Sequence, residues 1–266
     1  MIYITGDIHG DIQTFKDVMG RVTCKSENTL IVLGDLGANY YLNKIDKKFK
    51  KIISEYNINL FVIRGNHDAN PANLNYMKEI KKYENIGYIE EEYSNIFYAK
   101  NGEVYNIENN TFLVLGGAYS VDKWYRLSNN YIWFKDEQLT DEEMLQCTID
   151  LTNQKVDFVL THTCPICWEP SDLFLNSINQ SSVDKSMELF LEELAQCFDW
   201  TIWCFAHYHA DRLERPYVEQ FYRDTENIEE LWERWNQYSK TKELDWWLDK
   251  SQNFHMTDIL TLEENK

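Results

Sequence analysis

Three short apolar runs near the start of the chain each end in glycine followed by a residue that can bind a metal. The runs IYIT, TLIVL and NLFVI lead into GDIHG, GDLG and RGNHD. Such runs, rich in β-branched residues, are typical of buried strands with loops at their C-terminal ends. The segments 12–22 and 42–56 lie between them and have helical periodicity. Strand alternating with helix predicts a parallel sheet with right-handed crossovers. The expected buried faces are Phe15, Val18, Met19 and Val22 in the first helix and Ile45, Phe49, Ile52 and Ile53 in the second.

The second half of the chain has mainly the pattern of β structure. Segment 87–120 contains several short alternating runs, and its breaks at KNGE (100–103) and ENNT (108–111) predict hairpin turns. The later runs VDFVLTH and TIWCFAHYH repeat the early pattern, because each is an apolar strand ending in histidine. We expect a helix between them, with Met187, Phe190, Leu191 and Leu194 on its buried face.

The last part of the chain has a different pattern. Asn227 is a suitable N-cap for a helix, with Glu229 and Glu230 in its first turn. We therefore divide the chain into a main domain, 1–222, and a tryptophan-rich extension, 223–266, packed on that domain as an amphipathic helix. A homo-oligomer surface and a lid are the alternatives for this extension. Its apolar residues at helical spacing are Ile228, Leu231, Trp232, Trp235 and Tyr238, and it also holds Trp246 and Trp247.

The formal net charge of −18 limits the partners that we expect. Nucleic acids and anionic membranes attract basic surfaces, so the composition gives no strong signal for either. No apolar run is long enough to span a bilayer, and MIYITGDIHG lacks the regions of a signal peptide. We expect a cytoplasmic protein with reduced cysteines. The CxxC at Cys164 and Cys167 lacks the second pair that a zinc ribbon needs.

Five of the six histidines stand at the ends of predicted strands, where catalytic groups of α/β proteins gather. Asp7 and His9 are separated by one residue, so in an extended segment both side chains point the same way. Asp35 is suited to bridge two ions, because a carboxylate has two oxygens with free lone pairs. Imidazole and oxygen donors favour Mn, Fe, Zn or Ni over Ca. The seven candidate ligands are Asp7, His9, Asp35, Asn66, His162, His207 and His209.

The charge of such a site favours phosphate chemistry. Two divalent ions would outweigh two carboxylates and a hydroxide and leave about +1 in the pocket. A positive pocket inside an acidic protein suits an anionic ester, and two-metal sites activate water for in-line displacement.

The blocks GDIHG, GDLG, RGNHD, TH and HYH, in this order, resemble those of the calcineurin-like metallophosphoesterases over residues 1–212. The resemblance implies an α/β (α+β) fold in which a two-sheet β-sandwich is flanked by helices in four layers. It also implies two divalent metal ions, with Mn the most suitable in vitro. By motif position, one ion would take Asp7, His9, Asp35 and His209, and the other Asp35, Asn66, His162 and His207.

The same resemblance implies roles for residues around the metals. His67 matches a non-ligand histidine that assists transition-state charge or protonates the leaving group, and Asp68 would orient it. Arg64 matches a phosphate-binding arginine of phosphoprotein phosphatases, whereas Ala38 and Asn39 replace that group's Asp-Arg pair. Ala206 stands where the family usually has glycine.

Segment 116–126, GGAYSVDKWYR, and the run THTCP resemble a bacterial and phage subset of the family with similarity to Ser/Thr phosphatases. Surface ion pairs are the alternative role for the two basic residues of that segment. The candidate substrate contacts are Asn39, Tyr119, Asp122, Lys123 and Arg126.

Together these motifs predict a hydrolase, a binuclear-metal-dependent phosphoesterase in which a metal-bridging hydroxide attacks in line. Arg64 favours a phosphomonoesterase acting on a phosphorylated protein or small molecule. A phosphodiesterase or nucleotide hydrolase is the alternative within this class. A non-catalytic scaffold or binding module on the same fold is the alternative from a different class.

Overall fold

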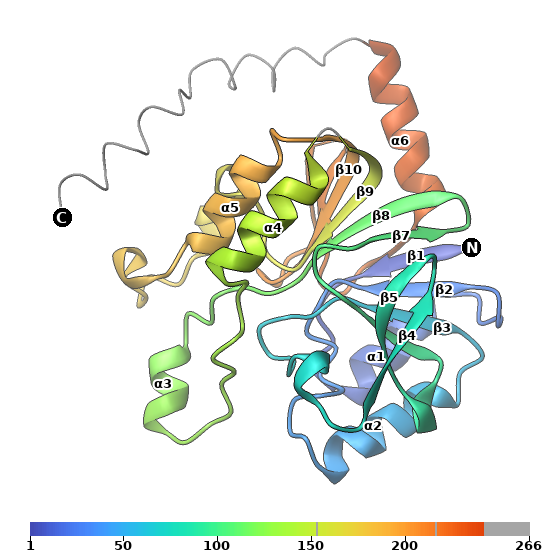
Figure 1. The fold of residues 1–266 in the computed structure, drawn as a ribbon, viewed down its shortest axis with the longest axis vertical. Helices are drawn as coiled ribbons and strands as arrows, with labels where there is room; N and C mark the ends of the chain where they lie inside the picture. The colour runs from blue at the N-terminus through green and yellow to red at the C-terminus, as the bar shows by residue number, and fades with distance from the viewer. Residues whose placement is uncertain (153, 216, 242–266) are drawn as a thin grey trace.

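The strands of the protein form two sheets that lie face to face in the computed structural model, which describes residues 1–152, 154–215 and 217–241 (Figure 1). The first sheet has the order β13 (Thr225–Asn227), β1 (Ile2–Thr5), β2 (Thr29–Val32), β3 (Asn59–Val62), β6 (Ile96–Ala99), β5 (Asn85–Glu90) and β4 (Met77–Lys82). The second has the order β11 (Arg212–Arg215), β12 (Val218–Gln220), β10 (Asp199–Phe205), β9 (Lys155–Thr161), β8 (Asn110–Leu115) and β7 (Val104–Ile107).

The predicted parallel arrangement is confirmed at the centre of each sheet. β1, β2, β3 and β6 run parallel in the first sheet, and β8, β9, β10 and β12 in the second. Thr5 pairs with Val32, and Val32 pairs with Val62, so these strands end level with one another. The loops that follow them therefore meet at one edge of the sandwich.

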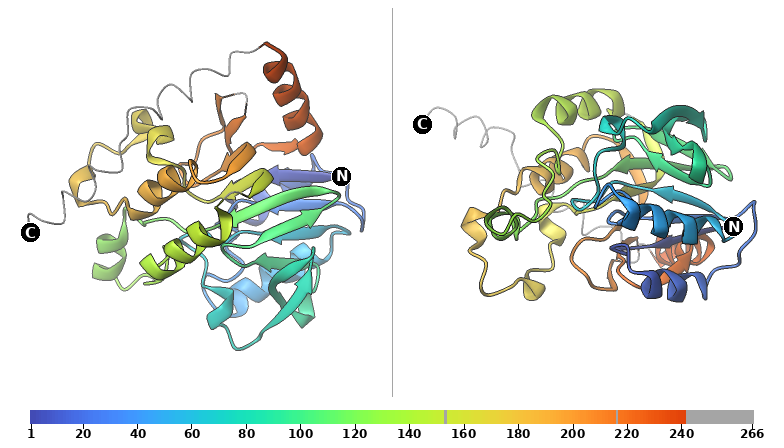
Figure 2. Two further views of the ribbon diagram at one scale, coloured as in Figure 1. Left: turned by 45° about the horizontal axis from the view of Figure 1, so that its top comes forward. Right: turned by 90° about the horizontal axis from the view of Figure 1, so that it is seen from below.

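Alternation along the strands divides the apolar side chains between two kinds of core. Ile4 and Phe61 point into the core between the sheets, where they meet Phe158 of β9. Tyr3 and Leu60 point the other way and pack under the first pair of helices. The first sheet is covered by α1 (Ile12–Met19) and α2 (Lys44–Ser54), and the second by α4 (Asp141–Leu151) and α5 (Ser186–Leu194) (Figures 1 and 2). The four-layer sandwich expected from the sequence is confirmed.

Two local predictions were wrong. The KNGE segment joins β6 to β7, which lie in different sheets, so it is a crossover between the sheets and not a hairpin turn. Ile45 of α2 is exposed, because the stripe that faces the sheet also contains Asp46 and Lys50. Asp46 accepts hydrogen bonds from the backbone of the preceding loop, and Lys50 Nζ lies 2.6 Å from Glu90 Oε2.

The ENNT segment does form the predicted hairpin turn. Glu108 and Asn109 connect β7 to β8, and both have positive φ, as a type I′ turn requires. Tyr83 and Glu84 make the same kind of turn between β4 and β5.

The extension begins with β13, which pairs with β1, and continues as α6 (Ile228–Thr241). Asn227 caps α6, since its side-chain oxygen accepts from the Glu229 backbone at 3.0 Å. Trp232 packs on Phe158 and donates a hydrogen bond to Asn110 at 2.9 Å. Trp246 and Trp247 lie outside the described residues, so the division at residue 222 stays a prediction. Among the helices that the structure describes, none has the length and apolar character needed to cross a bilayer.

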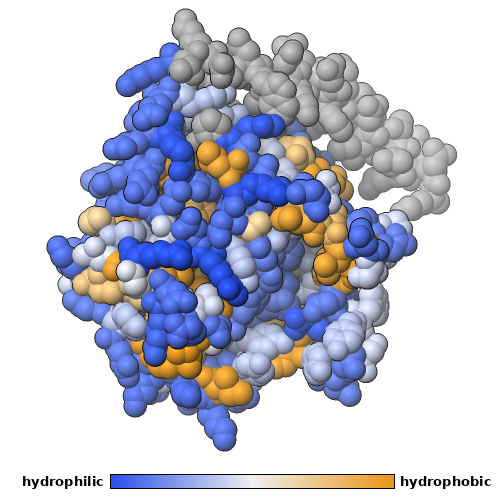
Figure 3. Space-filling view, turned by 180° about the vertical axis from the view of Figure 1, so that it is seen from behind, coloured by the Kyte–Doolittle hydropathy of each residue, from blue (hydrophilic) through white to orange (hydrophobic). Residues whose placement is uncertain are grey.

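Two segments protrude from the end of the sandwich opposite α6 (Figures 1 and 2). The α3 arm (residues 119–136) carries α3 (Lys123–Ser128), whose six residues are all partly or largely exposed. The η4 arm (residues 165–185) carries the 3-10 turns η3 (Ile166–Trp168), η4 (Ser171–Leu173) and η5 (Gln180–Ser182). Two further 3-10 turns, η1 (Pro71–Asn73) and η2 (Glu91–Tyr93), flank β4 and β5. On the face seen in Figure 3, hydrophobic patches interrupt a largely hydrophilic surface.

Candidate metal centre

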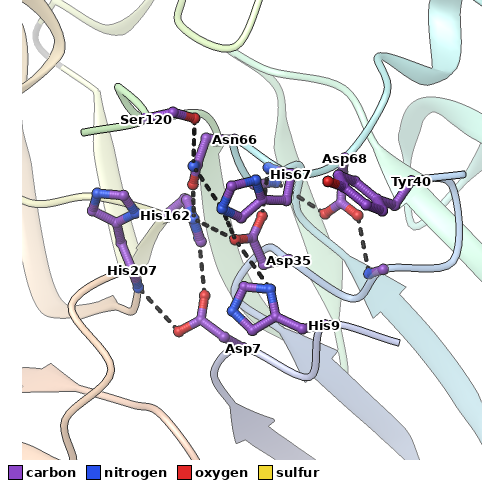
Figure 4. Close-up of polar contacts among 12 residues, drawn as sticks. Asp7, His9, Asp35, Tyr40, Asn66, His67, Asp68, Ser120, His162 and His207 are labelled. Carbon is purple, nitrogen blue, oxygen red and sulfur yellow. Dashed lines mark hydrogen bonds and ion pairs between the residues drawn. The ribbon is translucent and has the colours of Figure 1, made fainter. Parts of the chain in front are cut away.

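The loops after five strands bring the candidate ligands to one edge of the sandwich; six of them are labelled in Figure 4, and His209 lies beside His9. These loops turn sharply, because four of the ligands have positive φ: 53° at His9, 50° at Asp35, 70° at His207 and 55° at His209. Non-glycine residues adopt this conformation rarely, and it persists where the surrounding structure enforces it. Asp7 and Asp35 follow β1 and β2, Asn66 follows β3, and His162 and His207 follow β9 and β10.

Glycine is required where these loops approach one another. A Cβ on Gly65 would lie 1.9 Å from Asp35 Oδ1, and a Cβ on Gly34 would lie 2.2 Å from His162 Nδ1. The glycines before the ligands thus let side chains from neighbouring loops come within contact distance. Ala206, which replaces a family glycine, is fully buried in a backbone conformation that accepts its methyl group.

Asp35 lies at the centre of the cluster. Its Oδ2 atom is 3.7 Å from His9 Nδ1 and 3.6 Å from His162 Nε2, while its Oδ1 accepts from the His67 backbone at 2.8 Å. Asp7 also contacts both parts of the cluster: His162 Nδ1 lies 3.8 Å from Asp7 Oδ1, and the His207 backbone donates to Asp7 Oδ2 at 3.2 Å. The Asp35 carboxylate, which is predicted to bridge, thus lies next to histidines of both proposed ion sites.

The donors fit a metal ion. The Asp7 Oδ1 atom is buried and has no hydrogen-bond partner among the described residues. The Nε2 atoms of His9 and His209 lie 2.9 Å apart, a contact that needs a proton or a cation between two lone pairs. Ligand atoms of Asp7, His9 and His209 come within 4.8 Å of one another, as do those of Asp7, Asp35 and His162.

Histidine 162 is held in a fixed orientation. Its Nδ1 donates to the Leu33 carbonyl at 2.7 Å, which leaves Nε2 directed at the cluster, 2.9 Å from Asn66 Oδ1. A backbone carbonyl on one ring nitrogen is the usual way in which a metal-binding histidine is oriented. Without a cation both nitrogens face oxygen atoms, so the protonated ring is favoured.

Burial and mutual charge set the protonation of the cluster. Burial, opposed by His162, raises the pKa of Asp7 to about 8. Burial alone would lower the pKa of His162, but Asp35 and Asp7 raise it to about 9. Burial lowers the pKa of His209 to about 4 and also lowers the pKa values of His9 and His207. These three imidazoles are neutral at pH 7, the form in which histidine binds a metal.

Comparison with known protein families identifies the family of this chain. The family model described as calcineurin-like phosphoesterase matches residues 1–211. The chain belongs to the calcineurin-like phosphoesterase family. A search of curated proteins found no match. Among solved structures, a phosphopantetheinyl hydrolase from Mycobacterium tuberculosis is 12% identical, with a TM-score of 0.42, covering 89% of this chain and 91% of that one.

The three residues that we expected to be catalytic, His67, Asp68 and Arg64, have different positions relative to the ligand cluster. His67 borders the cluster, with Nε2 4.0 Å from Asp35 Oδ2. Both Asp68 carboxylate oxygens accept from backbone N–H groups, of Gly37 and Gly65, at 3.1 Å, and among the described residues we find no hydrogen bond from the His67 ring to Asp68 that would orient it. Asp68 thereby ties together the loops that carry Asp35 and Asn66.

Arg64 faces away from the cluster, contrary to the expectation that it binds phosphate. Its guanidinium donates to the Asp136 carbonyl and lies 3.8 Å from the Asp136 carboxylate. It lines a separate cavity of about 670 Å³ on the other side of the loop. Arg64 thus fixes the end of the α3 arm to the β3 loop.

Arg126 supplies the cation that Arg64 does not. Its guanidinium donates to Asp122 and to the Tyr40 hydroxyl, each at 2.7 Å, and reaches to 3.4 Å from His67 Nε2. The pairing with Asp122 is the ion pair predicted as an alternative, and the same side chain also borders the candidate metal centre.

The other expected substrate contacts fall into two groups, those that line the cleft and those that make contacts within the protein. Tyr119 lines the cleft at the metal centre, whereas Asn39 is buried and accepts from the Tyr76 hydroxyl at 3.2 Å. Lys123 Nζ packs over Trp133, 4.4 Å from the ring centroid, and over Tyr119 at 5.4 Å. This lysine therefore holds the α3 arm together.

Sequence reasoning missed several side chains that support the centre. Asn66 Nδ2 donates to Ser120 Oγ at 2.9 Å, and Ser120 in turn donates to the buried carboxylate of Glu137. The Tyr222 ring stacks on His209 at 4.7 Å. Ser120 ends the segment GGAYS, so the resemblance of that segment was the one signal for it. Nothing local in the sequence indicates Glu137 or Tyr222.

Proposed function

We propose that this family member is a binuclear-metal-dependent phosphomonoesterase. The observation that carries the proposal is the convergence of the seven candidate ligands on one edge of the sandwich, with Asp35 next to both His9 and His162. Neutral imidazoles and a buried carboxylate oxygen without a partner are suited to divalent ions of the Mn, Fe, Zn or Ni type. When bound, two such ions would activate water and neutralise charge on the phosphoryl oxygens.

The residues that would hold the ions fall into two overlapping groups. Asp7, His9 and His209 already lie close enough to bind one ion together. Asn66 and His162 lie on the opposite side of Asp35 and are in mutual contact at 2.9 Å. Asp35 would be the ligand shared by both, and His207 completes the second group.

In this proposal His67 acts on the leaving group. Burial lowers the pKa of its imidazole, and Asp35 opposes that shift. A dianionic phosphate in the cleft would favour the protonated ring, which could then give its proton to the departing oxygen. Arg126 lies on the same side and would bind the phosphoryl oxygens by charge-assisted hydrogen bonds.

The cation beside His67 supports a monoester over a diester, because a monoester carries the additional negative charge that a guanidinium binds. The net charge of the chain, −18, gives no overall attraction for a nucleic acid. Hydrolysis of diesters or nucleotides remains the second candidate, since the metal groups alone do not distinguish the two classes.

The test is hydrolysis of 4-nitrophenyl phosphate and bis(4-nitrophenyl) phosphate by the Mn²⁺-loaded protein. We expect a higher kcat/KM for the monoester. A higher value for the diester would favour the second candidate. If neither ester nor any member of a broad phosphorylated panel is hydrolysed, the catalytic proposal fails. Fewer than about one tightly bound metal ion per chain would then support a scaffold.

A further inference from the structure

The cleft at the candidate metal centre extends between the α3 arm and the η4 arm, which the catalytic proposal uses only at Arg126. Figures 1 and 2 show these arms side by side at the same end of the sandwich. The cleft has a volume of about 640 Å³ and is lined by both arms as well as by His67 and His209. That volume is within the range of small-molecule sites.

Much of the lining that the η4 arm contributes is apolar. It includes Leu173, Phe174, Leu175 and Ile178 beside the polar Glu169, Gln180 and Lys185. The same cleft is lined by Tyr41 and by Val121 of the α3 arm. Several of these side chains are exposed, Leu175 to 63% and Tyr41 to 46%. Exposed apolar side chains that converge on a functional cleft mark a ligand-binding surface, whereas isolated ones need no explanation.

The apolar wall is continuous with the candidate metal centre. Phe174 stacks on Tyr208, with ring centroids 6.2 Å apart, and Tyr208 lies in sequence between the candidate ligands His207 and His209. Lys185 Nζ lies 4.8 Å from the centroid of the Phe174 ring and pairs with Glu169. Phe174 is thus the part of the apolar wall that lies next to the candidate ligands. The group attached to a bound phosphate would lie there.

We infer that this wall is a leaving-group subsite that selects phosphate monoesters of alcohols or phenols with an apolar body. The inference rests on the proposed phosphomonoesterase function. A small ester of this kind would place its phosphate between the metal ligands and Arg126, and its apolar body against Phe174, Leu173 and Leu175. Esters of polyhydroxylated alcohols such as sugars would leave their hydroxyls against carbon and bind less well.

The test measures binding, so that it does not depend on turnover. Phenylphosphonate, 4-ethylphenylphosphonate and 4-butylphenylphosphonate are titrated into the Mn²⁺-loaded full chain by calorimetry. Burying one methylene strengthens binding about fourfold, so the butyl compound, which has two more methylenes, should bind about 15-fold more tightly than the ethyl compound. In the Leu173→Ser/Leu175→Ser variant this ratio should fall below about threefold.

A matched control is available on the outer face of α4. Leu145 and Ile149 are exposed to 63% and 60% and lie on a helix away from the cleft. The Leu145→Ser/Ile149→Ser variant should keep the wild-type ratio. Equal affinity for the three compounds in the wild type, an unchanged ratio in the arm variant, or no phosphonate binding at all would overturn the subsite.

The result is separable from the proposed function. Turnover of 4-nitrophenyl phosphate without a dependence on alkyl length overturns the subsite alone. A dependence on alkyl length without turnover of any phosphate ester overturns hydrolysis alone, and the apolar subsite stands.

Discussion

The strand-end ligands and the two arms border the same cleft, but they are built in different ways. Asp7, Asp35 and His162 are buried and held by loops with sharp turns between level strands. The α3 arm is exposed along its whole helix and is tied down by a few long side chains such as Arg126 and Lys123. The sandwich therefore fixes the positions of the reactive groups, and the arms are free to vary with the substrate.

The largest expected effect comes from the shared ligand in the rigid region. Asp35→Asn should lower kcat/KM for 4-nitrophenyl phosphate by more than the about 10²- to 10⁴-fold that a general acid contributes, because it weakens both proposed ion sites. Metal content measured on the same sample should fall as well. Asp17→Asn on α1, an exposed carboxylate, is the control and should change neither quantity.

His67→Ala separates chemistry from metal binding within the same region. We expect kcat to fall about 10²- to 10⁴-fold, since the proton donor for the leaving group is removed. The metal content should stay at the wild-type level, because His67 is not among the proposed ligands. A variant that loses its metals, or one that keeps its kcat, would contradict this role.

The two arginines test which region binds the phosphate. Arg126→Ala removes a charge-assisted contact and should raise KM about 10- to 100-fold, which corresponds to about 1.5–3 kcal/mol. Arg64→Ala removes a buried side chain and its hydrogen bond to the Asp136 carbonyl, so it should lower the melting temperature and change KM by less than about threefold. If Arg64→Ala had the larger effect on KM, the expectation from the resemblance would be restored.

The last effect concerns stability and not activity, namely the pH dependence of the free energy of unfolding at the base of the η4 arm. Burial raises the pKa of Glu188 to about 7, although Thr163 donates to it at 2.7 Å. The folded protein then holds this proton where the unfolded chain has lost it, so the free energy of unfolding falls as the pH rises from about 4.5 to about 7.

Glu188→Gln should remove that part of the pH dependence, on the order of 3 kcal/mol at most. Urea unfolding of the metal-free protein at pH 5 and pH 8 measures it. The wild type should lose more stability between these values than the variant does. Equal losses would show that Glu188 does not titrate in this range.

The fold and the ligand cluster were predictable because they depend on local patterns. Apolar runs that end in Gly and a polar residue gave β1, β2 and β3, and the periodicity of 12–22 gave α1 with Phe15 and Val18 buried. The order of the five sequence blocks resembles that of a known family, and this resemblance predicted the two-sheet sandwich. KNGE was misread because a turn sequence does not show which sheet the next strand joins.

The residues around the ligands were less predictable, because their positions depend on contacts between distant segments. Arg64 lies in the loop after β3, but its long side chain extends to Asp136, which belongs to the α3 arm and is distant in sequence. Asp68 satisfies two backbone amides of neighbouring loops instead of His67. Arg126 lies beside His67 while its guanidinium donates to Tyr40 and Asp122. The spacing of residues in the sequence does not indicate any of these three contacts.

The most direct test of the metal-pair account is the anomalous scattering of crystals grown with Mn²⁺. The account predicts two peaks on either side of Asp35, one against His9 and His209 and the other against Asn66 and His162. Both peaks should disappear or weaken strongly in Asp35→Asn crystals. One peak only, or two peaks that do not share Asp35, would contradict the account.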